Sequence, residues 1–132
     1  MIRKDIVLRW TQELAKVIAK ILGKETQEAL NIIEEAYKEL LFLDPKVFDQ
    51  LPNDQILDFL IQEKQLNIEQ LTFFAGLLAK EGELLHQIGE FTIARNKLEK
   101  ALIIFDHIER HHELFSFDRQ NTINTIKNLL NQ

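Results

Sequence analysis

The residues best suited to chemistry lie between Asp106 and Glu113, where three of the four histidines stand. His107 and His111 are four residues apart, so on a helix both imidazoles face one side and could share a metal ion. His112 points about 100° away from His111, which leaves that side without a third histidine. The His-Glu-x-x-His order that sets a general base beside zinc is also absent. A polar helix end, where histidine favours the terminal carbonyls, explains the cluster, and we predict no metal site.

The other side chains that commonly carry catalysis show no suitable arrangement. The glutamates at 34, 35, 39, 81 and 83 are expected on polar faces, as the like-charged pair four apart at 35 and 39 suggests. Ser116 is the single serine and lacks a Gly-x-Ser-x-Gly elbow, and no glycine-rich phosphate loop is present. Cysteine is absent, which excludes thiol catalysis and disulfides. We therefore predict a protein without catalytic residues or cofactor. The alternative is a metal-dependent or carboxylate-based enzyme built around His107 and His111.

The distribution of charge supplies a candidate binding surface. The formal net charge of the chain is −5, yet residues 1–24 carry six basic and two acidic side chains, a net charge of +4. Residues 25–132 carry ten basic and nineteen acidic side chains, a net charge of −9. An acidic chain of this kind repels a long phosphate backbone, so nucleic-acid binding through the first helix ranks last among the alternatives.

The basic residues near the start follow helical spacing. Four positions, Arg9, Glu13, Lys16 and Lys20, succeed one another at intervals of four, three and four, and Lys24 continues the series. They share one side of a helix, opposite the apolar stripe that contains Trp10. We predict that these four residues bind a partner, which their charge indicates is an acidic peptide or protein segment.

Composition indicates one helical domain over residues 1–132. Hydrophobic residues make up 45% of the chain, whereas Gly (4) and Pro (2) are too scarce for the many turns of a β-sandwich. The densest apolar stretch, from Leu71 to Ala79, is interrupted by Thr72 and is too short to span a membrane. The first residues lack the apolar stretch and cleavage site of a signal peptide, so a cytoplasmic location is expected.

Apolar periodicity predicts about six helices in three antiparallel hairpins. The first pair covers residues 4–43, with a turn at Gly23, a cap at Thr26 and an end at Asp44-Pro45. A degenerate region, residues 44–66, has one turn at 45–49 and a short helix capped by Asn53. The second pair covers residues 68–114 and opens with a capping box of Asn67 and Gln70. Its first helix is apolar on two sides, which predicts a central position. Ser116 or Asp118 caps a last helix, residues 118–130, with a thin apolar stripe typical of a terminal repeat.

The stretch from Leu78 to Phe105 has the spacing of a tetratricopeptide repeat, with Gly82 and Ala94 small where two helices would cross and Phe91 filling the turn at Gly89. The alanine pair Ala29 and Ala36 repeats the pattern 65 residues earlier, close to twice the family period. The chain thus resembles tetratricopeptide-repeat-like proteins. Its opening, residues 5–15, also resembles a family of uncharacterised bacterial helical proteins, which implies a bacterial source and no assigned activity.

The resemblance implies a superhelical stack in which the first helix of each pair lines a concave groove. The basic residues of the first helix would then edge a groove suited to an acidic segment. We therefore predict a non-enzymatic protein–protein interaction or scaffold module that binds another protein or itself.

Overall fold

The prediction of an all-α protein is confirmed. The computed structural model describes the backbone of residues 2–112 and 115–132, and the side chains of residues 9–112 and 115–132. Helices account for 82% of the chain, and these residues include no strand. None of the helices described is both long enough and apolar enough to cross a bilayer.

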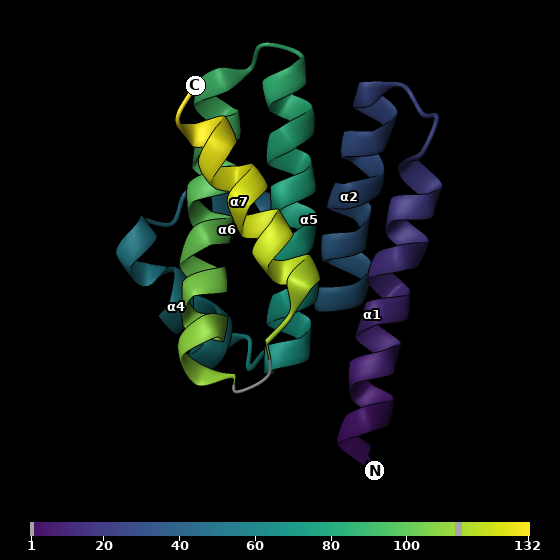
Figure 1. The fold of residues 1–132 in the computed structure, drawn as a ribbon, viewed down its shortest axis with the longest axis vertical. Helices are drawn as coiled ribbons and strands as arrows, with labels where there is room; N and C mark the ends of the chain where they lie inside the picture. Colours follow the sequence, from purple (N-terminus) through teal and green to yellow (C-terminus); the bar gives the residue numbers. More distant parts are fainter. Residues whose placement is uncertain (1, 113–114) are drawn as a thin grey trace.

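The first two helices, α1 (Ile2–Ile21) and α2 (Thr26–Leu41), run antiparallel beside one another (Figure 1). Gly23 turns the chain with a positive φ of 75°, as expected for a residue without a side chain. The predicted cap at Thr26 was one residue late: the Glu25 side chain accepts the backbone N–H of Gln27 at 3.2 Å. Both helices bury one stripe, which includes Trp10 and Tyr37.

The middle region differs from the single short helix predicted, and the predicted cap at Asn53 was wrong, since Pro52 precedes the first helical residue and no side chain caps it. Helix α3 (Pro45–Asp49) matches the expected turn, and Asp44 caps it by accepting the backbone N–H of Lys46 at 3.0 Å. Three short segments follow in place of one helix: a 3-10 turn (Asn53–Gln55), α4 (Ile56–Asp58) and a π-helical turn (Phe59–Glu63). The changes of helix type bring Ile56 and Leu60 into the core.

Helix α5 (Ile68–Gln87) occupies the centre of the molecule, packed against α1, α2, α6 and α7, as its two apolar sides predict. The predicted capping box opens it: Asn67 accepts the N–H of Gln70 at 2.8 Å, and Gln70 accepts that of Asn67 at 3.0 Å. Gly89, with a φ of 82°, leads into α6 (Phe91–His111), which runs antiparallel to α5 (Figure 1).

The close crossing predicted for α5 and α6 is confirmed at Gly82. A Cβ atom there would lie 2.6 Å from the Leu98 side chain and 3.3 Å from the Ala94 carbonyl oxygen. The predicted role of Phe91 was wrong. Phe91 is 60% exposed, and its ring packs edge-on to His86 at 4.9 Å instead of filling the turn. Ile88, just before the turn at Gly89, is also exposed.

The last helix, α7 (Phe117–Leu130), lies obliquely across α5 and α6 (Figure 1). Ser116 is its cap and accepts the backbone N–H of Arg119 at 3.1 Å, so the alternative cap at Asp118 was wrong. Ile123 and Ile126 are buried, whereas the asparagines at 121, 124 and 128 are exposed, which matches the thin stripe predicted. The described chain holds seven α-helices, where about six were predicted.

Helix α2 ends in a strained position that offers a test. Phe42 has a φ of 54° in the left-handed region although its side chain is 78% exposed and packs against little. Phe42→Gly is expected to raise the free energy of unfolding by about 0.5–1 kcal/mol, because glycine adopts this conformation without steric cost. Urea denaturation measures the change. Leu22→Gly, an exposed residue with ordinary φ, is the control, and an equal gain from both variants would contradict the argument.

Candidate functional site

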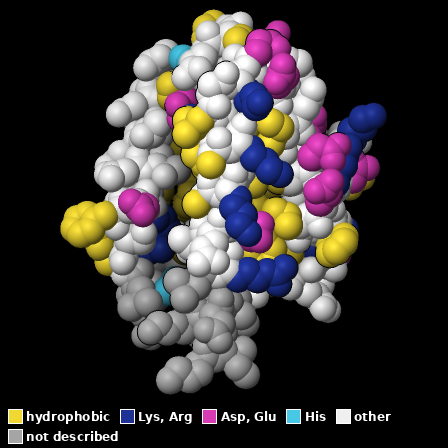
Figure 2. All heavy atoms as spheres, turned by 90° about the vertical axis from the view of Figure 1, so that its right-hand side faces the viewer, with side chains coloured by type: hydrophobic (Ala, Val, Ile, Leu, Met, Phe, Trp, Pro, Cys, Tyr) yellow, Lys and Arg dark blue, Asp and Glu magenta, His cyan; other side chains and the backbone are white. Residues whose placement is uncertain are grey.

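The predicted basic residues form an exposed stripe on α1. Arg9, Lys16 and Lys20 are exposed and lie seven and four residues apart along α1. Figure 2 shows a column of Lys and Arg side chains on this face of the molecule. Lys16 lies 3.6 Å from Glu13, and the Arg9 guanidinium lies over the Trp10 ring at 5.1 Å. The structure thus keeps Arg9, Glu13, Lys16 and Lys20 on one side of the helix; we call Arg9, Lys16 and Lys20 the basic stripe.

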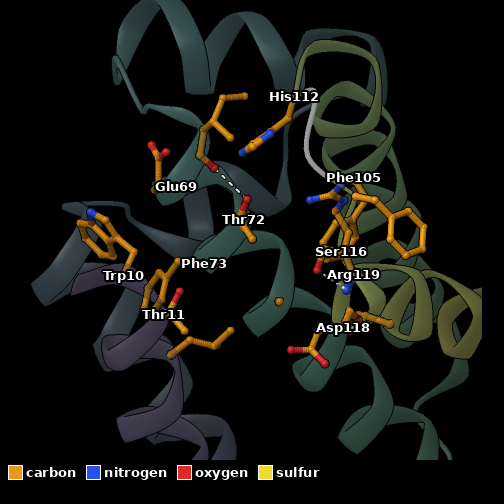
Figure 3. Close-up of a pocket in the computed structure, with 15 residues that line it drawn as sticks. Trp10, Thr11, Glu69, Thr72, Phe73, Phe105, His112, Ser116, Asp118 and Arg119 are labelled. Carbon is orange, nitrogen blue, oxygen red and sulfur yellow. Dashed lines mark hydrogen bonds between the residues drawn. The ribbon is translucent and has the colours of Figure 1, made fainter. Parts of the chain in front are cut away.

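A hollow lies on the other side of α1, between α1 and α7 and above α5 (Figure 3). Its accessible volume is about 340 Å³. Four aromatic side chains line it from three helices and the segment before α7: Trp10, Phe73, Phe105 and Phe115. Thr72 lies at its floor and donates its hydroxyl to the Ile68 carbonyl at 2.8 Å. This hollow is large enough to hold an aromatic side chain.

A second hollow of about 310 Å³ continues the first along α5. The two share Leu14 of α1, Gly76 of α5 and Thr122 of α7. Together they form one trough, which we call the α1–α7 groove. Its floor follows one face of α5 from Glu69 to Glu83.

The charged side chains of the α1–α7 groove include two that are neutralised within the chain. Lys80 lies 3.5 Å from Glu83 on the floor. The Arg119 Nε lies 3.2 Å from a Glu109 carboxylate oxygen, and its side chain is almost fully buried. The α1 wall consists of uncharged residues, Trp10, Thr11, Leu14 and Ile18. None of the four predicted partner-binding residues lines the groove, so the α1–α7 groove and the basic stripe are separate surfaces.

The three histidines between Asp106 and Glu113 divide between two places. The rings of His107 and His111 lie side by side with centroids 4.4 Å apart, as their spacing predicts, whereas His112 lines the α1–α7 groove. Asp106 is held by Arg110 at 3.1 Å, and Glu113 lies outside the described residues. Burial, and then His111, lower the pKa of His107, against a rise caused by Asp106. Among the side chains described, no three His, Asp or Glu residues are grouped to hold a metal ion.

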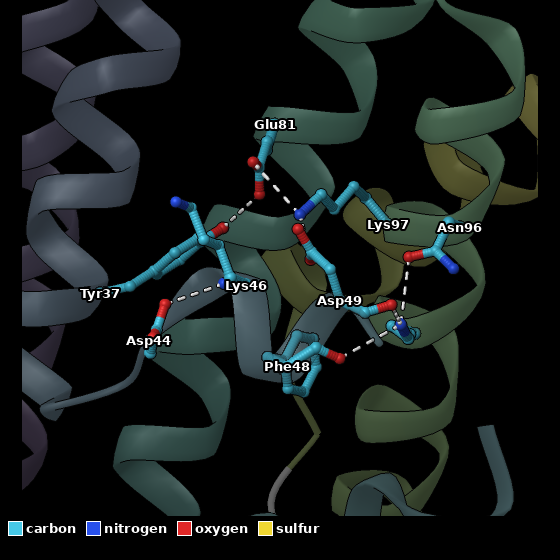
Figure 4. Close-up of polar contacts among 9 residues, drawn as sticks. Tyr37, Asp44, Lys46, Phe48, Asp49, Glu81, Asn96 and Lys97 are labelled. Carbon is cyan, nitrogen blue, oxygen red and sulfur yellow. Dashed lines mark hydrogen bonds and ion pairs between the residues drawn. The ribbon is translucent and has the colours of Figure 1, made fainter. Parts of the chain in front are cut away.

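One buried cluster of ionisable residues could not be foreseen as a site from the sequence (Figure 4). Lys97 of α6 forms ion pairs with Asp49 of α3 and with Glu81 of α5, the latter at 3.5 Å. The Tyr37 hydroxyl of α2 donates to Glu81 at 2.8 Å. Glu81 is 4% exposed, so its predicted place on a polar face was wrong. The cluster ties α2, α3, α5 and α6 together through two carboxylates and the Lys97 ammonium.

Lys100 extends this cluster along α6. Its ammonium donates to the carbonyl oxygens of Phe48 at 3.3 Å and Asp49 at 2.9 Å, and to the Asn96 side chain at 3.1 Å. Burial lowers the pKa of Lys100, and burial likewise raises the pKa of Tyr37 and of Glu81. None of these side chains lines one of the described hollows, and their contacts hold α3 against α5 and α6.

Comparison with known proteins adds no relative: no family model, no curated protein and no solved structure matches this chain.

Proposed function

We propose that the protein is a non-enzymatic interaction module that receives an amphipathic helix of another protein in the α1–α7 groove. The observation that carries this proposal is the trough itself, with an aromatic hollow at one end and a second hollow continuing from it. Concave sites of this kind, apolar with a few polar groups, are the usual places where proteins bind ligands.

The shape of the groove favours a helix as the bound segment. The described residues offer no strand, so no sheet edge is available to pair with an extended peptide. The floor from Glu69 to Glu83 covers fifteen residues of α5, and the rise from the first to the last is about 21 Å. A bound helix of about four turns has this length, and its anchors would recur every three or four residues.

The residues that line the α1–α7 groove determine which side chains a bound helix can present to it. Lys80 and Arg119 have carboxylate partners, so a charged residue set against them would gain little and lose its hydration. The aromatic hollow fits one large apolar side chain, such as phenylalanine or leucine, as the main anchor. The expected partner therefore carries an apolar stripe with an aromatic or leucine residue near one end.

The fold proposal that accompanies this function is a tetratricopeptide-like pairing of α5 with α6. It is supported by the close approach at Gly82, where Leu98 and Ala94 face a residue without a side chain. Small residues at a helix crossing are the physical basis of that repeat. The region between α2 and α5, with its short 3-10 and π-helical turns, supplies no regular repeat of its own.

Filling the groove is expected to weaken binding. Thr122 is half-buried in both hollows, so Thr122→Trp places an indole where a partner's side chain would lie. Peptides of about 18 residues, selected from a library of amphipathic helices, provide the probe. We expect Thr122→Trp to weaken them at least tenfold, and their chemical-shift changes in the wild type to map to α1, α5 and α7.

The matched control is Asn124→Trp, which adds the same ring to an exposed position of α7 outside both hollows. This variant should bind the selected peptides as the wild type does. A library that yields no binder would contradict the proposal, and so would peptides that bind Thr122→Trp and Asn124→Trp equally.

A further inference from the structure

Two stripes of opposite charge lie side by side on the outer face of the first hairpin. The basic stripe follows α1, while the exposed acidic residues Glu28, Glu35 and Glu39 follow the neighbouring α2. We call these three the acidic stripe. Figure 2 shows the column of Lys and Arg with acidic side chains beside it.

The two stripes do not neutralise each other within the molecule. Among the side chains described, no ion pair joins α1 to α2, and the ion-pair partner of Lys16 is Glu13 on its own helix. The face therefore presents a positive and a negative strip to solvent. Ile32, on the same helix as the acidic stripe and between Glu28 and Glu35, is half-buried and adds apolar surface to this face.

This pattern is complementary to itself under one symmetry operation. A two-fold axis lying in the face and parallel to the helices sets α1 of one copy over α2 of the other. Because the hairpin turns at Gly23, Lys20 lies near the height of Glu28, and Arg9 near that of Glu39. A two-fold axis perpendicular to the helices would instead set basic stripe on basic stripe, which repels.

We propose that the first hairpin is a self-association surface, on which the acidic segment that binds the basic stripe is the acidic stripe of a second copy. The face is small: α2 is about 24 Å long, and a two-helix width of about 20 Å gives near 1,000 Å² of total buried area. An interface of that size, rich in exposed ion pairs, forms a weak dimer that salt dissociates.

Sedimentation velocity over a range of protein concentrations tests this proposal. In about 50 mM salt the average mass should rise towards that of two chains, and about 500 mM salt should raise the dissociation constant at least tenfold. Two charge-reversed proteins complete the experiment: Lys16→Glu with Lys20→Glu, and Glu28→Lys with Glu35→Lys. Each alone should remain monomeric at concentrations where the wild type associates.

The decisive arm mixes the two charge-reversed proteins. The first protein then carries two acidic stripes and the second carries two basic ones. Every contact between them joins opposite charges, so heterodimers should form in low salt and dissociate in high salt. Lys46→Glu with Lys127→Glu, at exposed positions on other helices, is the control and should associate as the wild type does. Thermal melts of all variants establish that they are folded.

A wild type that stays monomeric at every concentration in low salt overturns the proposal. So does a dimer that both charge-reversed proteins still form. The result is independent of the groove, because Thr122→Trp lies on α7 and should leave the dissociation constant of the dimer unchanged. Loss of peptide binding and loss of dimerisation thus report on separate surfaces.

Discussion

Lys97→Met is expected to lower the free energy of unfolding at neutral pH by about 3–5 kcal/mol, the range for a buried ion pair that loses one member. Lys97 is 3% exposed and is the cation between Glu81 and Asp49. Without it, the two carboxylates face each other with only the Tyr37 hydroxyl to satisfy Glu81. Methionine keeps the length and apolar character of the side chain, so packing is largely preserved and the loss reports the charge.

The pH dependence gives this variant a second signature. Burial already raises the pKa of Glu81 above 4.5, against the lowering effects of Lys97 and of the Tyr37 hydrogen bond. A carboxyl with a raised pKa binds a proton in the folded protein that the unfolded chain has released, so stability falls as the pH rises through that range. Removing Lys97 takes away a lowering influence. The difference between the variant and the wild type should therefore grow from about pH 4.5 towards neutrality.

Urea denaturation at several pH values measures both effects. The control is Lys80→Met, which removes the half-buried partner of Glu83 on the floor of the α1–α7 groove and should cost less than about 1 kcal/mol. In a double-mutant cycle, Glu81→Gln with Lys97→Met should cost clearly less than the sum of the single changes. Equal losses for Lys97→Met and Lys80→Met would show that the buried cluster contributes no more than a surface pair.

The helices could be predicted from sequence because their signals are local. Caps and turns at Asn67, Ser116, Gly23 and Gly89 depend on residues within one turn, and apolar spacing fixes the buried stripe. The middle region could not be predicted in the same way. Its changes from 3-10 to α to π geometry bring Ile56 and Leu60 into the core, and long-range packing decides that outcome.

The same difference between local and long-range signals applies to the basic stripe and the α1–α7 groove. The basic stripe was predicted because Arg9, Lys16 and Lys20 belong to one helix. The α1–α7 groove was not predicted, because its walls are more than a hundred residues apart in sequence and α7 crosses at an angle that no local pattern encodes. The sequence did contain one signal for the buried cluster. Lys97 and Lys100 lie between Ala94 and Ala101 on the buried side of α6, and a charged side chain that is buried requires a partner.

Gly82→Ala is expected to destabilise the protein by about 1–3 kcal/mol although alanine is the better helix former. On an open helix surface, the same change would stabilise by up to about 1 kcal/mol. At Gly82 the added Cβ would meet the Leu98 side chain at 2.6 Å and the Ala94 carbonyl oxygen at 3.3 Å. Leu98 is buried, so it has no space to turn aside without separating α5 from α6. Ala94→Leu overpacks the same crossing from the other helix and should cost a similar amount.

Gly76→Ala is the matched control, since it makes the same substitution within the same helix. A Cβ at Gly76 would meet only the end of the Leu14 side chain, at 3.3 and 3.6 Å, on the partly open floor of the α1–α7 groove. Leu14 can shift by the few tenths of an ångström required, so the gain in helix propensity should prevail and stability should hold or rise. Urea midpoints of the two variants should therefore move in opposite directions. If Gly82→Ala raises the midpoint as Gly76→Ala does, the helices do not cross closely at Gly82, and the support for a tetratricopeptide-like pairing of α5 and α6 is removed.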